Sequence, residues 1–209
     1  MRKLISFLVV LVFSTTMIGV LNAKEVTLLM DWFPQGNQSG YWQAQFDNDD
    51  HDLKIQVKAG GPKVNTTQMV ASGQVEFGLQ ASDSVMMANA KGAGLKGIFV
   101  SLNHVPYTLV FHPNTGVKSV KDLDGRPFAV KMGVTYWKWV KQKYQLNAVK
   151  EFPLTGDLGL FARTKDQFQQ GYSLFLPARL AAKGVDTEQI TIESLGYRPY
   201  SILFTTDKL

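Results

Sequence analysis

Residues 64–79 read V-N-T-T-Q-M-V-A-S-G-Q-V-E-F-G-L, and this stretch indicates the class of fold. Its first nine residues carry apolar side chains at helical spacing and predict a helix over 64–72, and Gly73 stands where a helix C-terminal glycine belongs. The apolar residues over 75–79 then predict a strand. A helix that passes through a glycine directly into a strand is typical of α/β proteins.

The same alternation continues on both sides of this stretch. The predicted strands are 26–30, 53–57, 75–79, 97–100, 107–112, 126–130, 149–154, 172–176, 190–194 and 200–205, and the predicted helices are 64–72, 83–91, a short one at 119–125, 134–146, 159–170 and 178–183. Strand, helix and strand in this order predict mostly parallel sheets flanked by helices. The chain is long for one domain and short for two large ones, so we expect two small α/β lobes.

The N-terminal segment has the features of a secretory signal peptide. Arg2 and Lys3 precede an apolar run over 4–13, which is shorter than the roughly 20 residues that a membrane helix needs. We therefore expect residues 1–23 to be removed after Ala23 and the protein to reside in a bacterial periplasm. The chain has no cysteine, which excludes disulfides. Its net charge is +5, and removal of residues 1–23 takes away two cations and no acid, so the expected mature chain has 22 − 2 = 20 basic residues against 17 acidic ones. The resulting net charge of +3 is not that of a nucleic-acid-binding protein.

The sequence offers few groups for catalysis or metal binding. The three histidines, His51, His104 and His112, are not at metal-ligand spacing, and no cysteine could complete a zinc site. Nucleophile-elbow, Walker and dinucleotide-binding motifs are absent from the sequence. The acidic run 47–52 lacks the oxygen spacing of a calcium loop and is interpreted as a solvated turn. We therefore expect a protein that binds without a cofactor or a metal and is not an enzyme.

The loops that follow the strands are the place to search for a ligand site, because open α/β sheets bind ligands beyond the carboxyl ends of their strands. The first such loop, residues 31–42, reads D-W-F-P-Q-G-N-Q-S-G-Y-W and joins an acid to four aromatic residues. Flat, rigid rings can hold a planar ligand with a small loss of conformational entropy. Trp32 and Tyr41 either contact such a ligand or pack under the loop, and we expect Phe33 and Trp42 to pack there.

The helix predicted over 134–146 supplies a second candidate. Val134, Trp137 and Tyr144 fall on one stripe, which is most simply its buried face. Tyr136 lies off that stripe and in the first turn, where free backbone N–H groups can hold an anion or a polar ligand edge. We therefore treat Tyr136 as a candidate ligand-binding residue.

Several motifs resemble a known family when they are taken together with their spacing. They are D-W-F-P-Q (31–35), A-G-G-P-K-V-N (59–65), Q-M-V-A-S-G-Q-V-E-F-G-L (68–79), S-D (82–83), A-K-G (90–92) and V-K-S-V-K-D-L-D-G-R (117–126). On these motifs the chain resembles the thiamine-pyrimidine-precursor synthesis-like family of solute-binding proteins of ABC importers. Aliphatic-sulfonate and nitrate binders are wider relatives. The resemblance implies a type II periplasmic-binding-protein fold, in which two α/β lobes close on a small, planar organic solute, and a monomer that meets an ABC permease.

The resemblance also implies a division of the chain. Residues 24–113 would form the N-terminal part of lobe one, 114–196 lobe two, and 197–209 the strand that returns to lobe one. Relatives continue beyond this strand with helices that cover lobe one, so we expect a shortened, marginally stable chain.

By the same resemblance, Asp31 would accept N–H donors from a ligand such as an aminopyrimidine, and Trp32 would offer a ring face. The remaining candidate ligand-binding residues are Gln80, Ser82 and Asp83 on the wall of lobe one, Gly133, Tyr136 and Phe175 from lobe two, and Asn37 and Tyr41 in the first loop. Asn37 lies in G-N-Q-S (36–39), where relatives often have a histidine. Where relatives have N-E-P-Y, this chain reads F-L-P-A (175–178), and the loss of the carboxylate favours a more apolar or less cationic ligand.

Two alternatives remain beside an importer component. One is a sensory or non-transporting ligand-binding protein. The other is an enzyme like the eukaryotic pyrimidine synthases, which consume their own active-site histidine. That enzyme would need a histidine in the cleft and a cysteine-rich segment.

Overall fold

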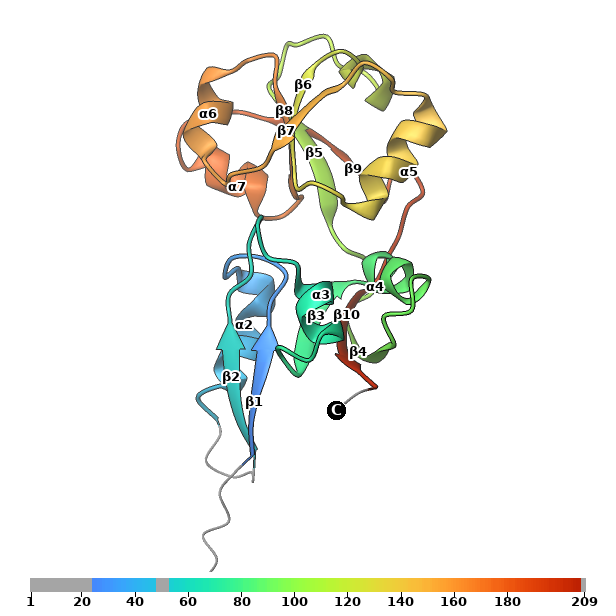
Figure 1. The fold of residues 1–209 in the computed structure, drawn as a ribbon. Coiled ribbons are helices and arrows are strands. Elements are labelled where there is room, and N and C mark those ends of the chain that lie inside the picture. Colours follow the sequence, from blue (N-terminus) through green and yellow to red (C-terminus); the bar gives the residue numbers. More distant parts are fainter. Residues whose placement is uncertain (1–23, 48–52, 208–209) are drawn as a thin grey trace, which may run out of the picture.

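The computed structural model describes residues 24–47 and 53–207. They form two α/β units stacked end to end, each built around its own sheet (Figure 1). We call these units lobe one, which holds both ends of the described chain, and lobe two. The expected signal peptide, His51 and most of the acidic run 47–52 lie outside the described residues. In the described part, no helix combines the length and the apolar character needed to cross a membrane.

Lobe one contains a five-stranded sheet in the order β2-β1-β3-β10-β4. Its strands are β1 (Lys24–Leu29), β2 (Leu53–Lys58), β3 (Phe77–Ala81), β4 (Leu95–Leu102) and β10 (Ser201–Thr206), and its helices are η1 (Gly36–Gln38), α2 (Ser39–Ala44), α3 (Thr66–Ala71) and α4 (Ser82–Asn89). The predicted helix end at Gly73 is confirmed, because α3 stops just before it and Gly73 adopts a φ of 74°, which favours glycine.

Lobe two contains a second five-stranded sheet in the order β7-β6-β8-β5-β9. Its strands are β5 (Tyr107–Phe111), β6 (Pro127–Val130), β7 (Lys150–Pro153), β8 (Phe168–Tyr172) and β9 (Glu188–Thr191), and its helices are η3 (Val120–Leu123), α5 (Thr135–Tyr144), α6 (Leu158–Arg163) and α7 (Leu176–Ala181). The chain enters lobe two between β4 and β5 and leaves it between β9 and β10. Two connections therefore join the lobes, and the predicted two-lobed α/β architecture is confirmed (Figure 1).

The sheets are mixed rather than mostly parallel. In lobe one, β1 runs parallel to β2 and β3, whereas β10 runs antiparallel to β3 and β4. In lobe two, β6 runs parallel to β7 and β8, whereas β5 runs antiparallel to β8 and β9. The strands that break the parallel order, β5 and β10, are those that follow the two connections. The predicted lobe boundary at residue 113 therefore lies too late, because β5 already pairs within the sheet of lobe two.

The chain around residue 168 also differs from the prediction. The predicted helix 159–170 ends at Arg163 as α6, and the predicted strand 172–176 is replaced by β8, which ends at Tyr172. The glutamines of this segment, among them Gln169 and Gln170, favour a helix in isolation but are buried here. Pairing of β8 between β6 and β5 overrides that local preference.

An aromatic cluster fixes α5 on the sheet of lobe two. The ring of Phe128 on β6 stacks on Phe168 of β8 at 4.2 Å and meets Trp137 of α5 at 4.4 Å. Trp137 is buried, as its place on the predicted stripe requires. Because α5 follows β6 directly, this cluster also sets the position of the loop between them, which points toward lobe one.

The return strand β10 is anchored by a buried aromatic ring. Phe204 is 0% exposed, and a Cβ atom added to Gly78 of the neighbouring β3 would lie only 2.7 Å from the Phe204 ring. The missing side chain at Gly78 therefore makes room for this ring between the sheet and the helices of lobe one.

We predict that Phe204→Ala lowers the free energy of unfolding by about 3–5 kcal/mol, because it deletes a fully buried ring and leaves a cavity. Phe99→Ala is the matched control, since Phe99 belongs to the adjoining β4 but is 59% exposed. This control should change the free energy of unfolding by no more than about 0.5 kcal/mol. Urea denaturation followed by circular dichroism measures the free energy of unfolding of both variants. If Phe204→Ala and Phe99→Ala lose equal amounts, Phe204 does not anchor β10 in lobe one.

Candidate functional site

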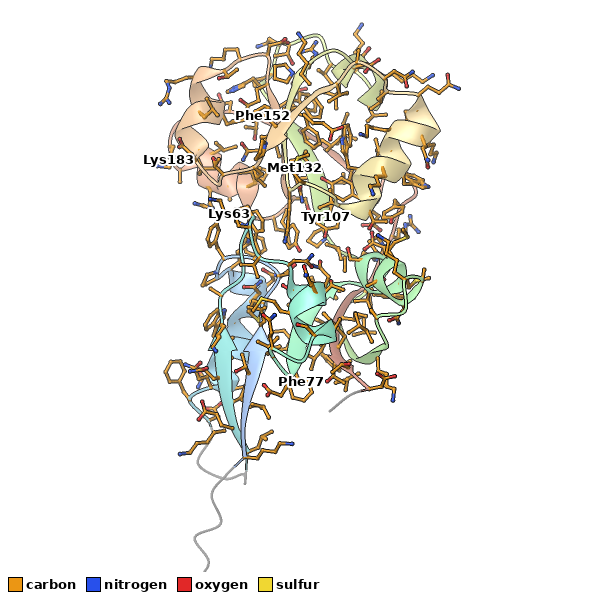
Figure 2. All side chains as sticks on the ribbon, in the orientation of Figure 1. Lys63, Phe77, Tyr107, Met132, Phe152 and Lys183 are labelled. Carbon is orange, nitrogen blue, oxygen red and sulfur yellow. The ribbon has the colours of Figure 1, made fainter. Side chains whose placement is uncertain are left out.

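A cleft of about 700 Å³ lies between the two lobes. Lobe one lines it with the loop after β1, the segment 62–68 and α4, and lobe two lines it with the segment 131–136 and the end of β8. Figure 2 shows Lys63 of lobe one on one side of the junction, and Tyr107 and Met132 of lobe two on the other. Much of the lining follows the carboxyl ends of β1, β3, β6 and β8, as the strand-end rule predicts, although the start of β5 and the end of α4 also contribute.

Asp31 is a buried carboxylate at the lobe-one side of this cleft. It follows the end of β1 closely and is 8% exposed. Gln38 Nε2 donates to its Oδ1 at 3.1 Å, and the hydroxyl of Tyr172, from lobe two, donates to its Oδ2 at 3.2 Å. Burial raises the pKa of the Asp31 carboxyl, and the positive charge of Lys131 opposes part of that rise.

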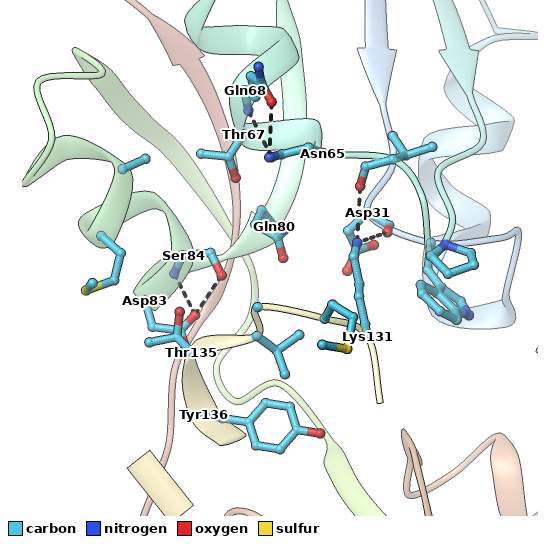
Figure 3. Close-up of a pocket in the computed structure, with 18 of the residues that line it drawn as sticks. Asp31, Asn65, Thr67, Gln68, Gln80, Asp83, Ser84, Lys131, Thr135 and Tyr136 are labelled. Atoms are coloured by element: carbon cyan, nitrogen blue, oxygen red, sulfur yellow. Dashed lines mark hydrogen bonds between the residues drawn. The ribbon is translucent and has the colours of Figure 1, made fainter. Parts of the chain in front are cut away.

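Lys131 reaches from the end of β6 across the cleft to lobe one (Figure 3). Its Nζ donates to the carbonyl oxygens of Asp31 at 3.4 Å and Val64 at 3.3 Å, and it lies 5.6 Å from the centre of the Trp32 ring. Its backbone N–H donates to Gln170 Oε1 at 2.9 Å, which holds the start of the loop. Burial lowers the pKa of the Lys131 amine, and the negative charge of Asp31 partly restores it.

Three tyrosines form the wall of lobe two behind Lys131. Tyr107 stacks on Tyr136 with ring centres 4.6 Å apart and meets the edge of Tyr172 at 5.5 Å. Burial raises the pKa of each phenol well above its ordinary value, so all three remain protonated donors at neutral pH. Tyr136 is 0% exposed, and its hydroxyl has no hydrogen-bond partner among the described residues. This hydroxyl is therefore a donor that a ligand could satisfy.

Asp83 lies in the first turn of α4. Its side chain links lobe one to the chain segment that leads from β9 back to β10. The Tyr197 hydroxyl donates to its Oδ2 at 2.7 Å, and the backbone N–H of Ser84 donates to its Oδ1 at 2.7 Å. Burial raises the pKa of the Asp83 carboxyl, and the Tyr197 hydrogen bond opposes this rise. Tyr197 in turn packs against Trp139 of α5, with ring centres 4.9 Å apart.

The cleft brings together six of the ten residues expected to bind a ligand, namely Asp31, Trp32, Gln80, Asp83, Gly133 and Tyr136. The other four, Asn37, Tyr41, Ser82 and Phe175, are not among its lining residues. Tyr41 packs against the buried cluster beneath β1 and β2, and Phe175 lies against Gly36. Ser82 Oγ accepts the backbone N–H of Tyr200 at 3.1 Å, so this side chain holds the chain that enters β10.

Two expectations about aromatic residues are wrong. Phe33 was expected to pack under its loop, yet it is 45% exposed, and its ring lies beside Gly61 of lobe one and Gly156 of lobe two. Tyr136 lies off the predicted buried stripe of α5, yet it is fully buried, because lobe two presents Tyr107 as a second aromatic surface for it.

Sequence reasoning did not select several residues of the cleft, above all Lys131, Tyr107, Tyr172 and Gln170. Lys131 could have been selected, because it is the first residue after a predicted strand. Tyr172 and Gln170 lie in the segment whose helix and strand were misplaced, so their side chains could not be assigned to the cleft from the sequence.

A family model described as NMT1/THI5 like matches residues 36–208. A Legionella pneumophila protein named 4-amino-5-hydroxymethyl-2-methylpyrimidine phosphate synthase is 28% identical over 111 residues, which cover 49% of this chain and 33% of that protein. This chain therefore spans only a third of the length of that relative.

Two solved structures show the same fold. The periplasmic aliphatic sulphonate binding protein SsuA from Escherichia coli superposes with a TM-score of 0.63 at 13% identity, over 90% of this chain and 62% of that one. The alkanesulfonate-binding protein SsuA from Xanthomonas axonopodis pv. citri, bound to MOPS, gives a TM-score of 0.64 at 14% identity, over 88% of this chain and 66% of that one. The fold is thus that of the type II periplasmic binding proteins, although this chain spans less than two thirds of either structure.

We predict that Asp31→Asn flattens the pH dependence of stability. Because burial raises the pKa of Asp31, the folded state binds this proton more tightly than the unfolded state does. The free energy of unfolding of the wild type should therefore fall as the pH rises from about 4 through the raised pKa, and asparagine removes this part of the fall. Urea denaturation at several pH values and constant ionic strength measures the slope.

Glu188→Gln, which removes an exposed carboxylate of β9, is the control and should keep the slope of the wild type. If the free energy of unfolding of Asp31→Asn fell with rising pH as steeply as that of the wild type, the claim that burial raises the pKa of Asp31 would be wrong.

Proposed function

Because this chain belongs to the NMT1/THI5-like family, we propose that it is the solute-binding protein of an ABC importer, which captures a small, planar organic solute in the cleft between its lobes. The observation that carries this proposal is the cleft itself. Its volume of about 700 Å³ lies within the range of small-molecule sites, and polar groups from both lobes converge on it.

The aromatic residues of the cleft favour a planar solute. Trp32 lines the cleft on the side of lobe one, and the pair Tyr107 and Tyr136 lines it on the side of lobe two. Rings on opposing walls can enclose a flat molecule and add contact area at a small cost in conformational entropy. The Tyr136 hydroxyl, which has no hydrogen-bond partner among the described residues, and the polar side chain of Gln80 would then orient the solute.

The connections between the lobes support closure around a solute. Lobe two touches lobe one through the hydrogen bonds of Tyr172 and Lys131, which lie on one side of the cleft, and through that of Tyr197 near the connections. A hinge at the two connections would break the hydrogen bonds of Tyr172 and Lys131 across the cleft and leave the connections in place. An opened cleft would admit the solute, and the closed form would be the one presented to a permease.

The name of the Legionella relative raises an enzymatic alternative. A synthase that consumes its own histidine would need that histidine in the cleft, but no histidine is among the described residues that line it. His112 is buried against Phe161 in lobe two, and His104 lies 3.8 Å from Glu193 at the surface. These placements support binding rather than synthesis, and the periplasmic relatives support a periplasmic location.

We predict that the protein, expressed with its own N-terminus and recovered from the periplasm, melts at a higher temperature in the presence of its solute. The test panel contains aminopyrimidines, thiamine fragments, flavins and sulfonates. Saturation at 100-fold above the dissociation constant adds about 2.7 kcal/mol, which raises the melting temperature by roughly 5–10 °C in a chain of this size.

Trp32→Ala should abolish this increase, because the ring lines the cleft. Phe33→Ala is the matched control, since Phe33 neighbours Trp32 in sequence but is exposed and not among the lining residues; it should keep the increase. A cooperative melt that no compound of the panel shifts would count against a solute-binding role.

A further inference from the structure

The cleft has an excess of positive charge. Its lining includes four lysines, Lys63, Lys91, Lys131 and Lys138, but only two acids, Asp31 and Asp83. Lys63, Lys91 and Lys138 are exposed and form no ion pair within residues 24–47 and 53–207. The cleft therefore presents its positive charge to whatever enters it.

Both acids of the lining are already occupied by groups of the protein. Asp31 accepts from Gln38 and from the Tyr172 hydroxyl, and Asp83 accepts from Tyr197 and from the backbone of Ser84. A cationic ligand would have to compete with these donors for the same oxygens. The acids are thus poor partners for an ammonium or amidinium group.

Lys131 differs from the other three lysines because the fold holds it in place. Two of its three N–H groups face the carbonyl oxygens of Asp31 and Val64, which leaves one for a ligand. Gln170 fixes its backbone, and the aromatic cluster beneath α5 fixes the loop in which it lies. The Lys131 side chain is half-buried, and its ammonium lies beside the Trp32 ring, which the proposed function assigns to a planar solute.

The neighbouring groups of lobe two add donors and no competing charge. Tyr136, five residues after Lys131, has a buried hydroxyl without a partner among the described residues. Its pKa is raised by burial, so it can donate but does not ionise at neutral pH. An ammonium and a phenol that both donate are complementary to an oxyanion.

We propose that Lys131 is the specificity-determining residue of the cleft and that it selects planar solutes with an anionic group over organic cations. The anionic group is a carboxylate, a sulfonate or a phosphate, which share the oxygen acceptors that Lys131 and Tyr136 can bind. This inference rests on the proposed function, since it names the charge class of the solute that the cleft would capture.

Isothermal titration with three planar probes of similar size tests the charge preference. Benzoate is anionic, benzamide is neutral and benzamidine is cationic, whereas benzenesulfonate and phenyl phosphate distinguish the three anionic groups. The wild type should bind at least one anionic probe about tenfold or more tightly than benzamidine, the change expected for one charge-assisted hydrogen bond.

Variants of the protein assign this preference to Lys131. Lys131→Met should lower the affinity for the anionic probe about tenfold and leave the affinity for benzamide unchanged. Lys131→Arg should keep the affinity for the anionic probe within about threefold, because it keeps the charge. Lys131→Glu should prefer benzamidine. Lys138→Met, which removes an exposed lysine of the same lining, is the control, and its smaller effect should vanish at high salt, where exposed charges are screened. Thermal melts verify that each variant folds.

Two results would overturn the assignment to Lys131. Equal losses of affinity for the anionic probe in Lys131→Met and Lys138→Met would assign the preference to the overall positive charge of the cleft. A wild type that prefers benzamidine or benzamide would contradict selection of anions while leaving solute binding intact. A cleft that binds none of these probes and none of the compounds in the thermal panel would instead contradict the proposed function, and the inference with it.

Discussion

The burial of the Asp31 carboxylate is the constraint on which the arrangement of the lobes depends. A carboxylate in so enclosed a place must be hydrogen-bonded or neutralised, because burial of an unpaired charge is costly. Lobe one supplies only part of what it needs, through Gln38. Lobe two supplies the rest, through the Tyr172 hydroxyl and the nearby charge of Lys131. The two lobes are thus complementary to each other at the point where each contributes to the cleft.

The order of the strands along the chain joins the two lobes through their sheets. The chain completes β1 to β4, builds all of lobe two, and only then returns as β10 between β3 and β4. Phe204 anchors that strand in the core of lobe one. Each sheet lies within one lobe, whereas the hydrogen bonds of Lys131 and Tyr172 cross the cleft. A hinge at the two connections, as proposed above, would break these hydrogen bonds and leave each sheet intact.

The sequence predicted those parts of the structure that depend on local patterns. Strand-end loops and an acid beside aromatic residues led to Asp31 and Trp32, and a glycine after an apolar helix led to the end of α3 at Gly73. It did not predict features that depend on pairing between distant segments. Gln169 and Gln170 carry no local signal for a strand, and only the flanking strands β6 and β5 impose one. Lys131 follows a predicted strand, but its contacts with the carbonyl oxygens of Asp31 and Val64 join segments that are distant in sequence.

The charge of the solute depends on one feature of the cleft, the ammonium of Lys131 beside a ring of the opposite lobe. Asp31 cannot offset this positive charge, because its oxygens already accept hydrogen bonds from the protein. The carboxylate that first suggests an amine ligand is therefore the group that holds the lobes together, and recognition of charge passes to the lysine across the cleft.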